Sequence, residues 1–159
     1  MKVLTCKGTL VAAITWLALG NVALLHAESC ANDSLKGKYG QTISGELLPG
    51  PGVVLPQNGV AMTDFDGNGK FTQTDFVVIN GSPTSTGFAS ETGTYHVNSD
   101  CTGTATINYS DGSEIVLELV VVKQGWEFRT VVTFLSMAGH PVPVNIGSNG
   151  VRVDGGDSH

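Results

Sequence analysis

One stretch of the sequence matches the ligand pattern of a calcium-binding loop, with acidic or amide residues at positions 1, 3, 5 and 12 and glycine at position 6. Such loops normally lie between helices, whereas residues 70–75 are typical of a β-strand. Residues 66–69 also form the strongest hairpin turn in the chain. We therefore interpret the motif as a hairpin and expect no cofactor. Calcium stays the weaker alternative, with ligands Asp64, Asp66, Asn68 and Asp75.

Nucleophilic catalysis requires a serine or cysteine beside an oriented histidine. After residue 27 the chain has only His96, His140 and His159, and it lacks both a G-x-S-x-G elbow and a paired-histidine zinc spacing. His96 lies in a predicted strand, where a histidine is more often part of a barrel wall than a base. No residue is assigned a catalytic role, and the sequence leans away from an enzyme.

Charged residues alternate along two predicted strands. Glu114 and Glu118 share one strand face, and Glu127 and Arg129 share a face of the next strand. We interpret them as solvated outer-wall charges that pair across the strands. In the alternative, Glu118 or Arg129 points into the barrel. Burying either side chain without a partner would be costly, so an inward position would indicate a contact with a ligand.

The elements that must position these residues are strands. Apolar and polar residues alternate almost to the end of the chain, with glycine-containing turns such as Asn80-Gly81 and Asp111-Gly112 at steady intervals. The pattern predicts an all-β, eight-stranded antiparallel up-and-down meander, closed into a small barrel that has no exposed edge. The predicted strands are 37–47, 58–65, 70–79, 88–97, 103–110, 114–123, 126–136 and 145–153.

Residues 1–27 have the pattern of a cleaved signal peptide, with Lys2 and Lys7 ahead of an apolar run. Residues 28–159 are then expected to form one barrel domain with a short disordered tail at about 154–159. The protein is therefore expected to be secreted or periplasmic. Cys30 and Cys101 remain as an even pair in an exported chain, which predicts a disulfide between them.

The charge balance excludes some partners. The net charge of the whole chain is −6, and all 14 acidic residues remain when the leader is removed, which argues against nucleic acid and anionic membranes. No later stretch is long and apolar enough for stable membrane insertion. An outer-membrane barrel is disfavoured because strands 70–75 and 103–110 lack a continuous apolar outward face. Strands 114–123 and 126–136 are partly apolar on both sides, which leaves a homo-oligomer open.

Two sets of residues resemble known barrels. Gly37-Lys38-Tyr39 in the first strand and Arg152 in the last resemble the lipocalin-like calycin superfamily, in which a G-x-W motif packs against a basic residue; here tyrosine replaces tryptophan. Segments 34–40, 65–69 and 93–104 resemble a family of uncharacterised exported bacterial proteins with an allene-oxide-cyclase-like or lipocalin-like barrel. These resemblances imply a fold and export, and they supply no catalytic residues.

The leading hypothesis is a barrel that binds a small hydrophobic ligand. The alternatives are a structural or interaction protein with a filled barrel, and a cofactor-free isomerase or cyclase. A continuous cavity favours the first and third hypotheses, and an inward carboxylate or His96 inside that cavity raises the third over the first. The candidate ligand contacts are Tyr39, Phe128, Val132, Phe134, Glu118, Arg129 and His96.

Overall fold

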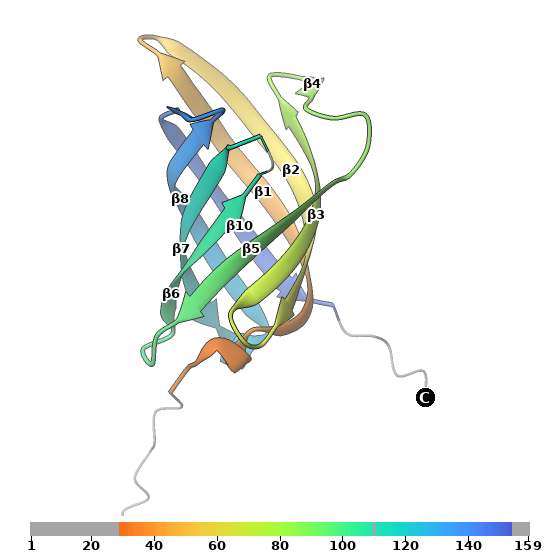
Figure 1. Cartoon of the computed structure of the whole chain (residues 1–159), viewed down its shortest axis with the longest axis vertical. Coiled ribbons are helices and arrows are strands. Elements are labelled where there is room, and N and C mark those ends of the chain that lie inside the picture. Colours follow the sequence, from red (N-terminus) through yellow and green to blue (C-terminus); the bar gives the residue numbers. More distant parts are fainter. Residues whose placement is uncertain (1–28, 110, 154–159) are drawn as a thin grey trace, which may run out of the picture.

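The computed structural model describes residues 29–109 and 111–153, and almost all of them belong to strands (Figure 1). The predicted leader and the tail from residue 154 lie outside the described residues. All eight predicted strands are confirmed, and two short strands, β4 (Ser82–Pro83) and β9 (His140–Pro141), are added. The long strands are β1 (Lys36–Gly50), β2 (Val53–Asp66), β3 (Lys70–Ile79), β5 (Ala89–Val97), β6 (Thr102–Asn108), β7 (Glu114–Val122), β8 (Glu127–Met137) and β10 (Val144–Arg152).

The long strands close into a ring. Each pairs in antiparallel fashion with the next, and β10 pairs with β8 on one side and with β1 on the other. Tyr39 lies opposite Arg152 at one end of the β1–β10 pairing, and Leu47 lies opposite Val144 at the other. The expected closed eight-stranded meander is therefore confirmed.

β1 and β2 are longer than predicted and extend beyond the other strands as a hairpin (Figure 1). Pro49 and Pro56 lie in this extension, which falls between the predicted strands 37–47 and 58–65. A proline is tolerated where a strand has no neighbour that needs its missing N–H. The pairing of β1 with β10 ends at Leu47, and that of β2 with β3 ends at Gln57, so both prolines lie where one side of the hairpin is free of ladder partners.

The wall is interrupted beside β5. Pairing between β3 and β5 ends at Asp75, opposite Ala89, and beyond it this edge of β3 pairs only with β4, while the other edge stays paired with β2. Pairing between β5 and β6 ends at Thr92, opposite Asn108. The connection from β4 to β5 swings away from the barrel (Figure 1). The first residues of β5 therefore lie next to a gap in the hydrogen-bonded wall.

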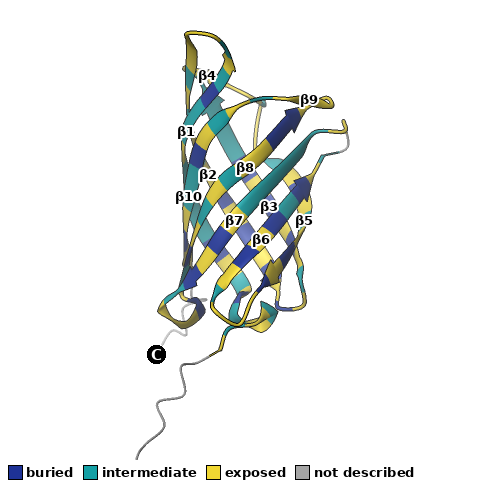
Figure 2. Cartoon of the chain, turned by 90° about the vertical axis from the view of Figure 1, so that its left-hand side faces the viewer, coloured by how far each residue is buried: buried dark blue, intermediate teal, exposed yellow. Residues whose placement is uncertain are grey.

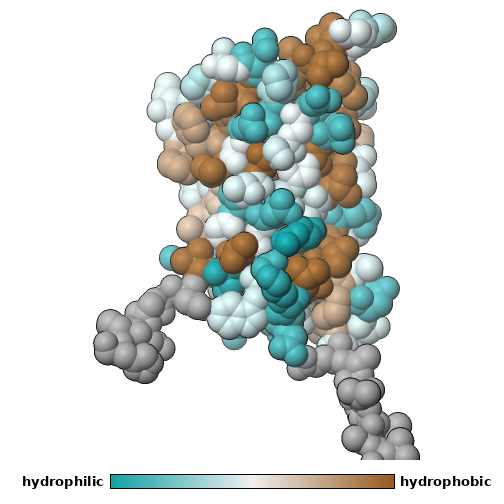
Figure 3. Space-filling view, turned by 180° about the vertical axis from the view of Figure 1, so that it is seen from behind, coloured by the Kyte–Doolittle hydropathy of each residue, from teal (hydrophilic) through white to brown (hydrophobic). Residues whose placement is uncertain are grey.

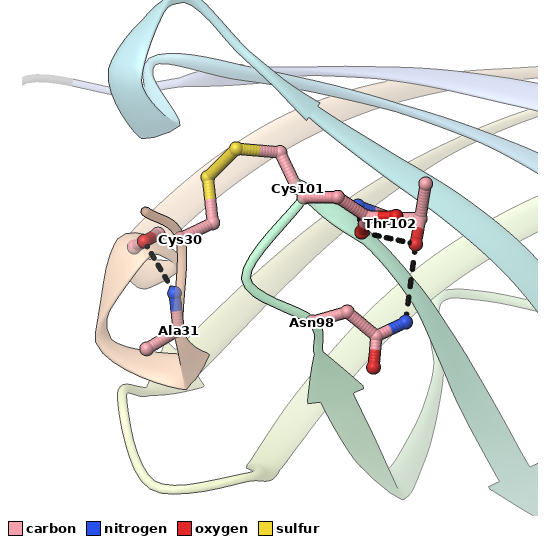
Figure 4. Close-up of a disulfide and its surroundings, with 7 residues drawn as sticks. Cys30, Ala31, Asn98, Cys101 and Thr102 are labelled. Atoms are coloured by element: carbon pink, nitrogen blue, oxygen red, sulfur yellow. Dashed lines mark hydrogen bonds between the residues drawn. A yellow bond between two sulfur atoms is a disulfide. The ribbon is translucent and has the colours of Figure 1, made fainter. Parts of the chain in front are cut away.

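The N-terminal segment closes the end of the barrel that lies opposite the extended β1–β2 hairpin. The 3₁₀ turn η1 (Asn32–Ser34) lies across this end, and the Tyr95 hydroxyl donates to the carbonyls of Asn32 and Leu35, both at 2.9 Å. Cys30 and Cys101 form the predicted disulfide, with a Cα–Cα distance of 4.9 Å across 71 residues of sequence (Figure 4). The disulfide fastens the closing segment to the turn between β5 and β6.

Buried and exposed residues alternate along the strands, as a one-layer barrel requires (Figure 2). The closed end is filled by an aromatic cluster in which the Phe65 ring lies 5.4 Å from Tyr39 and 5.5 Å from Phe128. Burying aromatic side chains stabilises a fold by roughly 2 to 3 kcal/mol each. A second apolar cluster near the other end contains Leu47, Leu135 and Ile146.

The outer surface carries both apolar and polar patches (Figure 3). Val120, Val131 and Phe134 are exposed on neighbouring strands β7 and β8. Self-association through this face stays a prediction. Among residues 29–109 and 111–153 there is no helix with the length and apolar character needed to cross a membrane.

Candidate interior binding site

A cavity of about 510 Å³ lies inside the barrel between the aromatic cluster and the open end. Its volume is in the range of small-molecule sites. Phe65, Phe71 and Phe128 form its floor, and Ser113, Met137 and Ala138 are among the residues near its mouth. Its apolar walls include Val77, Ile79, Ile107, Ile115, Leu117, Val132 and Leu135. The barrel interior is therefore hollow over part of its length.

A belt of hydrogen-bonded polar side chains crosses this apolar interior. Thr130 and Ser148 share a hydrogen bond of 2.7 Å, and the Ser148 hydroxyl donates to Gln41 Oε1 at 3.0 Å. Thr63 is 1% exposed, and its hydroxyl donates to Gln73 Oε1 at 2.8 Å. The belt joins side chains from five strands, namely Thr130 of β8, Ser148 of β10, Gln41 of β1, Thr63 of β2 and Gln73 of β3.

The belt has a direction. The Gln41 amide donates to Thr63 and to Gln73 Oε1, and the Gln73 amide in turn donates to Asp75 Oδ2 at 3.1 Å. Each amide therefore points its N–H groups towards Asp75, as expected when the chain of hydrogen bonds ends at a carboxylate acceptor.

Asp75 is one member of a buried carboxyl pair. Glu91 lies opposite Gln73 in the β3–β5 register, and Asp75 and Glu91 each have 8% of their surface exposed. The two carboxyl groups share a hydrogen bond. Glu91 Oε2 is buried and receives no hydrogen bond from any N–H or hydroxyl donor in the described part of the chain.

The two carboxyl groups cannot both ionise readily. Burial, the nearby Asp75 charge and the hydrogen bond to Asp75 raise the pKa of Glu91 to about 7. Burial also raises the pKa of Asp75, although the hydrogen bonds from Gln73 and Glu91 oppose this. Because the two acids are close together, their titrations are linked, and the pair keeps a proton until the pH rises to about 7.

Tyr109 completes the acidic side of the cavity. It follows β6 at the edge of the wall gap and lines the cavity together with Asp75 and Glu91. Burial, followed by the negative charges of Glu91 and Asp75, raises the pKa of its hydroxyl. Tyr109 therefore stays a neutral phenol, which can donate or accept a hydrogen bond.

Only some of the apolar residues predicted to contact a ligand lie in the cavity wall. Phe128 and Val132 line the cavity. Tyr39 is fully buried below the floor, where its hydroxyl donates to the Gly125 carbonyl, and it is not part of the lining.

Phe134 points outward and is 39% exposed, so its predicted place beside Phe128 and Val132 is corrected. The reason is a β-bulge: Val116 pairs with Phe134, but its neighbour Leu117 pairs with Val132. The extra residue, Thr133, shifts the alternation of side chains along β8. Leu135 consequently faces the interior in place of Phe134.

Glu118, Arg129 and His96 are exposed on the outer wall, and none of them lines the cavity. Arg129 Nη2 contacts Glu127 Oε2 at 2.8 Å, so its charge is paired on the surface. These positions agree with the solvated outer-wall interpretation and not with an inward ligand contact.

The calcium-like motif is divided between the two faces of the wall. Asp66 Oδ1 accepts hydrogen bonds from the backbone N–H groups of Asn68 at 2.7 Å and Lys70 at 3.0 Å, as in a tight turn. Asp64 is exposed, whereas Asp75 is buried inside the barrel. No cluster of three or more His, Cys, Asp or Glu side chains suited to a metal occurs in the described ranges.

The sequence interpretation missed the polar belt and Glu91. A signal was present, because Asp75 alternates with Phe71, Val77 and Ile79 on one face of its strand. Glu91 likewise shares a face with Tyr95. A carboxylate within an apolar strand face indicates a buried acid when that face is known to point inward.

Comparison with protein-family models and with curated proteins finds no match. Among solved structures, an S-type phycobiliprotein lyase, CPES, from Guillardia theta has a similar fold, with a TM-score of 0.50 and 8% sequence identity. The alignment covers 79% of this chain and 92% of the lyase chain. At this identity the similarity concerns the fold alone.

Proposed function

We propose that this protein binds one small, largely apolar molecule inside its barrel. The observation on which the proposal rests is the cavity of about 510 Å³, which is lined mainly by apolar side chains and has one cluster of polar groups. Apolar walls with a few convergent polar groups are typical of small-molecule sites. The cavity counts against the hypothesis of a filled barrel.

The resemblance to calycin barrels supports this proposal at the level of architecture. Arg152 lies opposite Tyr39 in the register of β10 and β1, and its guanidinium stacks 5.6 Å from the centre of the Trp126 ring. The basic residue of the last strand therefore lies beside the Gly37-Lys38-Tyr39 motif in the register, and the ring on which it stacks is Trp126. The similar fold of the phycobiliprotein lyase agrees with this barrel architecture.

We propose that the protein is exported to an oxidising compartment. A disulfide such as Cys30–Cys101 persists in oxidising compartments and is rare in the cytosol. The predicted leader would deliver the chain there. N-terminal sequencing of the exported protein should begin at Glu28, and recovery of the intact leader on a cytosolic protein would contradict export.

A second candidate function is acid–base isomerisation or cyclisation of the bound molecule. Asp75 and Glu91 are carboxyl groups inside the cavity, the feature that favours this function over simple binding. A carboxyl group with a pKa of about 7 is well matched to proton transfer at neutral pH. Incorporation of deuterium from heavy water into the bound molecule, lost in Glu91→Gln, would support catalysis over simple binding.

Native mass spectrometry of protein purified from its own host tests the binding proposal. We expect a complex heavier than the mature chain, and release of the additional mass on unfolding. A bare mass, combined with no calorimetric binding of octanol as an apolar probe, would overturn the proposal.

A further inference from the structure

We propose that the cavity selects an organic cation, with an ammonium group held between Asp75 and Glu91 and an apolar body against the walls beyond them. This inference rests on the proposed binding function and adds the charge of the ligand. It depends on the charge of the cavity, on the unmet hydrogen-bonding capacity of Glu91 and on the position of the carboxyl pair beside the gap in the wall.

The described cavity lining is acidic and has no basic counterpart. Asp75, Glu91 and, near the mouth, Asp111 contribute carboxyl groups, whereas no lysine, arginine or histidine lines the cavity. Buried carboxylates are normally paired with a cation or coordinate a metal. A ligand that brings its own positive charge would supply the missing partner, and an anionic ligand such as a fatty acid would be repelled.

The hydrogen bonds of the pair are incomplete. The polar belt supplies a donor to Asp75 through Gln73, but Glu91 Oε2 receives none, although Glu91 is more than nine-tenths buried. An ammonium has three N–H donors and no acceptor. It can therefore donate to Glu91 Oε2 and to Asp75 at the same time, and it would take the place of the proton that the pair otherwise shares.

The pair also lies beside the break in the hydrogen-bonded wall. Glu91 belongs to the part of β5 that extends past the last pairing with β6, and Asp75 is the last residue of β3 that pairs with β5. The short strand β4, which pairs with the end of β3, and the connection that follows it lie beside this break (Figure 1). Because Asp75 and Glu91 line the same cavity as the apolar walls, a cationic head group at the pair would leave its apolar body in the cavity.

A metal ion satisfies the same charge less well. Calcium requires six or more oxygen ligands, and magnesium requires six. The pair offers only two carboxyl groups and the Gln73 amide, and the described residues contain no larger acidic or histidine cluster. An organic ammonium needs only two or three acceptors, which is what the site offers.

Isothermal titration calorimetry of the mature chain with octylamine, octanol and octanoate tests the inference. At pH 8.5 octylamine is charged, and Glu91 has lost its proton. We expect octylamine to bind roughly tenfold more tightly than octanol, since charge-assisted hydrogen bonds are the strong ones. Octanoate should bind most weakly.

Glu91→Gln should remove the preference for octylamine and leave octanol binding unchanged. Glu118→Gln, an equivalent change on the exposed outer wall, should keep the preference. The wild-type chain provides a test that needs no substitution: at pH 5.5, where Glu91 is protonated beside Asp75, Tyr109 and Asp111, the preference for octylamine should fall about tenfold.

Equal or tighter binding of octanol would overturn the cation preference and leave the binding function standing. Tightest binding of octanoate would also overturn it. Calcium binding that is lost in Glu91→Gln and kept in Glu118→Gln would replace the organic cation with a metal. Absence of binding by all three octyl probes would overturn the proposed function together with this inference.

Discussion

Asp75 and Glu91 share a hydrogen bond inside a cavity whose described lining contains no lysine, arginine or histidine. Two acids so close together and so well buried reduce the stability of the fold once both are ionised. The strands around them nevertheless keep both side chains inside, and a directed series of hydrogen bonds ends at Asp75. A buried arrangement that is costly for stability is commonly found at functional sites.

The pH dependence of stability should reflect Glu91. Because its pKa rises from an ordinary 4.5 to about 7 in the folded state, its stabilising contribution is complete below about pH 4.5 and is lost as the pH rises through 7. The loss is at most about 3 kcal/mol. In urea unfolding, Glu91→Gln should therefore be more stable than the wild type at pH 8 and similar at pH 5. A wild-type stability that does not fall between pH 5 and pH 8 would contradict the raised pKa.

Removing the disulfide should destabilise the closed end of the barrel. Replacing both Cys30 and Cys101 by alanine frees a loop of 71 residues in the unfolded chain, which in the chain-entropy model lowers the free energy of unfolding by about 4 kcal/mol. Urea unfolding of the double variant measures the change. A loss below about 1 kcal/mol would show that the disulfide contributes little to closing the barrel.

Gly125 should be intolerant of a side chain. Its φ is +83°, and a Cβ atom would lie 2.0 Å from the Ser34 carbonyl oxygen in the closing segment. Gly112 has the same φ, but a Cβ atom there meets nothing within 4 Å. Gly112→Ala should cost about 1 kcal/mol for the backbone conformation alone, and Gly125→Ala distinctly more. Equal thermal unfolding temperatures for the two variants would mean that η1 does not press against Gly125.

Filling the cavity should abolish ligand binding while the fold persists. Val132→Trp adds a large side chain to the cavity wall, whereas Val131→Trp adds it to the opposite, exposed face of the same strand. Octylamine binding, measured by calorimetry, should be lost in the first variant and kept in the second. Circular dichroism checks that both are folded. Unchanged binding by a folded Val132→Trp variant would place the site elsewhere.

The sequence was sufficient to predict the strands and their order, because the turns carry strong local signals. Asp66-Gly67-Asn68-Gly69 and Asp111-Gly112 mark hairpins by residue type alone. The disulfide could be predicted because only Cys30 and Cys101 follow the expected leader. The extension of β1 and β2 was missed, and it contains prolines, which are uncommon in strands.

The site could not be predicted to the same depth, because alternation defines two strand faces without saying which one points inward. In β3, Phe71 and Val77 share one face while Phe76 and Val78 share the other, so the sequence leaves the side of Asp75 undecided. The bulge that turns Phe134 outward has no marker in the sequence of β8. The pairing of Glu91 with Asp75 depends on the register of β3 and β5, which only the assembled sheet defines.

An NMR titration of methyl-labelled protein with octylamine tests the central claim, that the barrel interior is a binding site, most directly. We predict shifts at the cavity methyl groups of Ile107, Leu117 and Val132, and none at Val120 or Val131 on the outer wall. Shifts confined to the outer-wall methyl groups, or none at saturating octylamine and octanol, would contradict the claim.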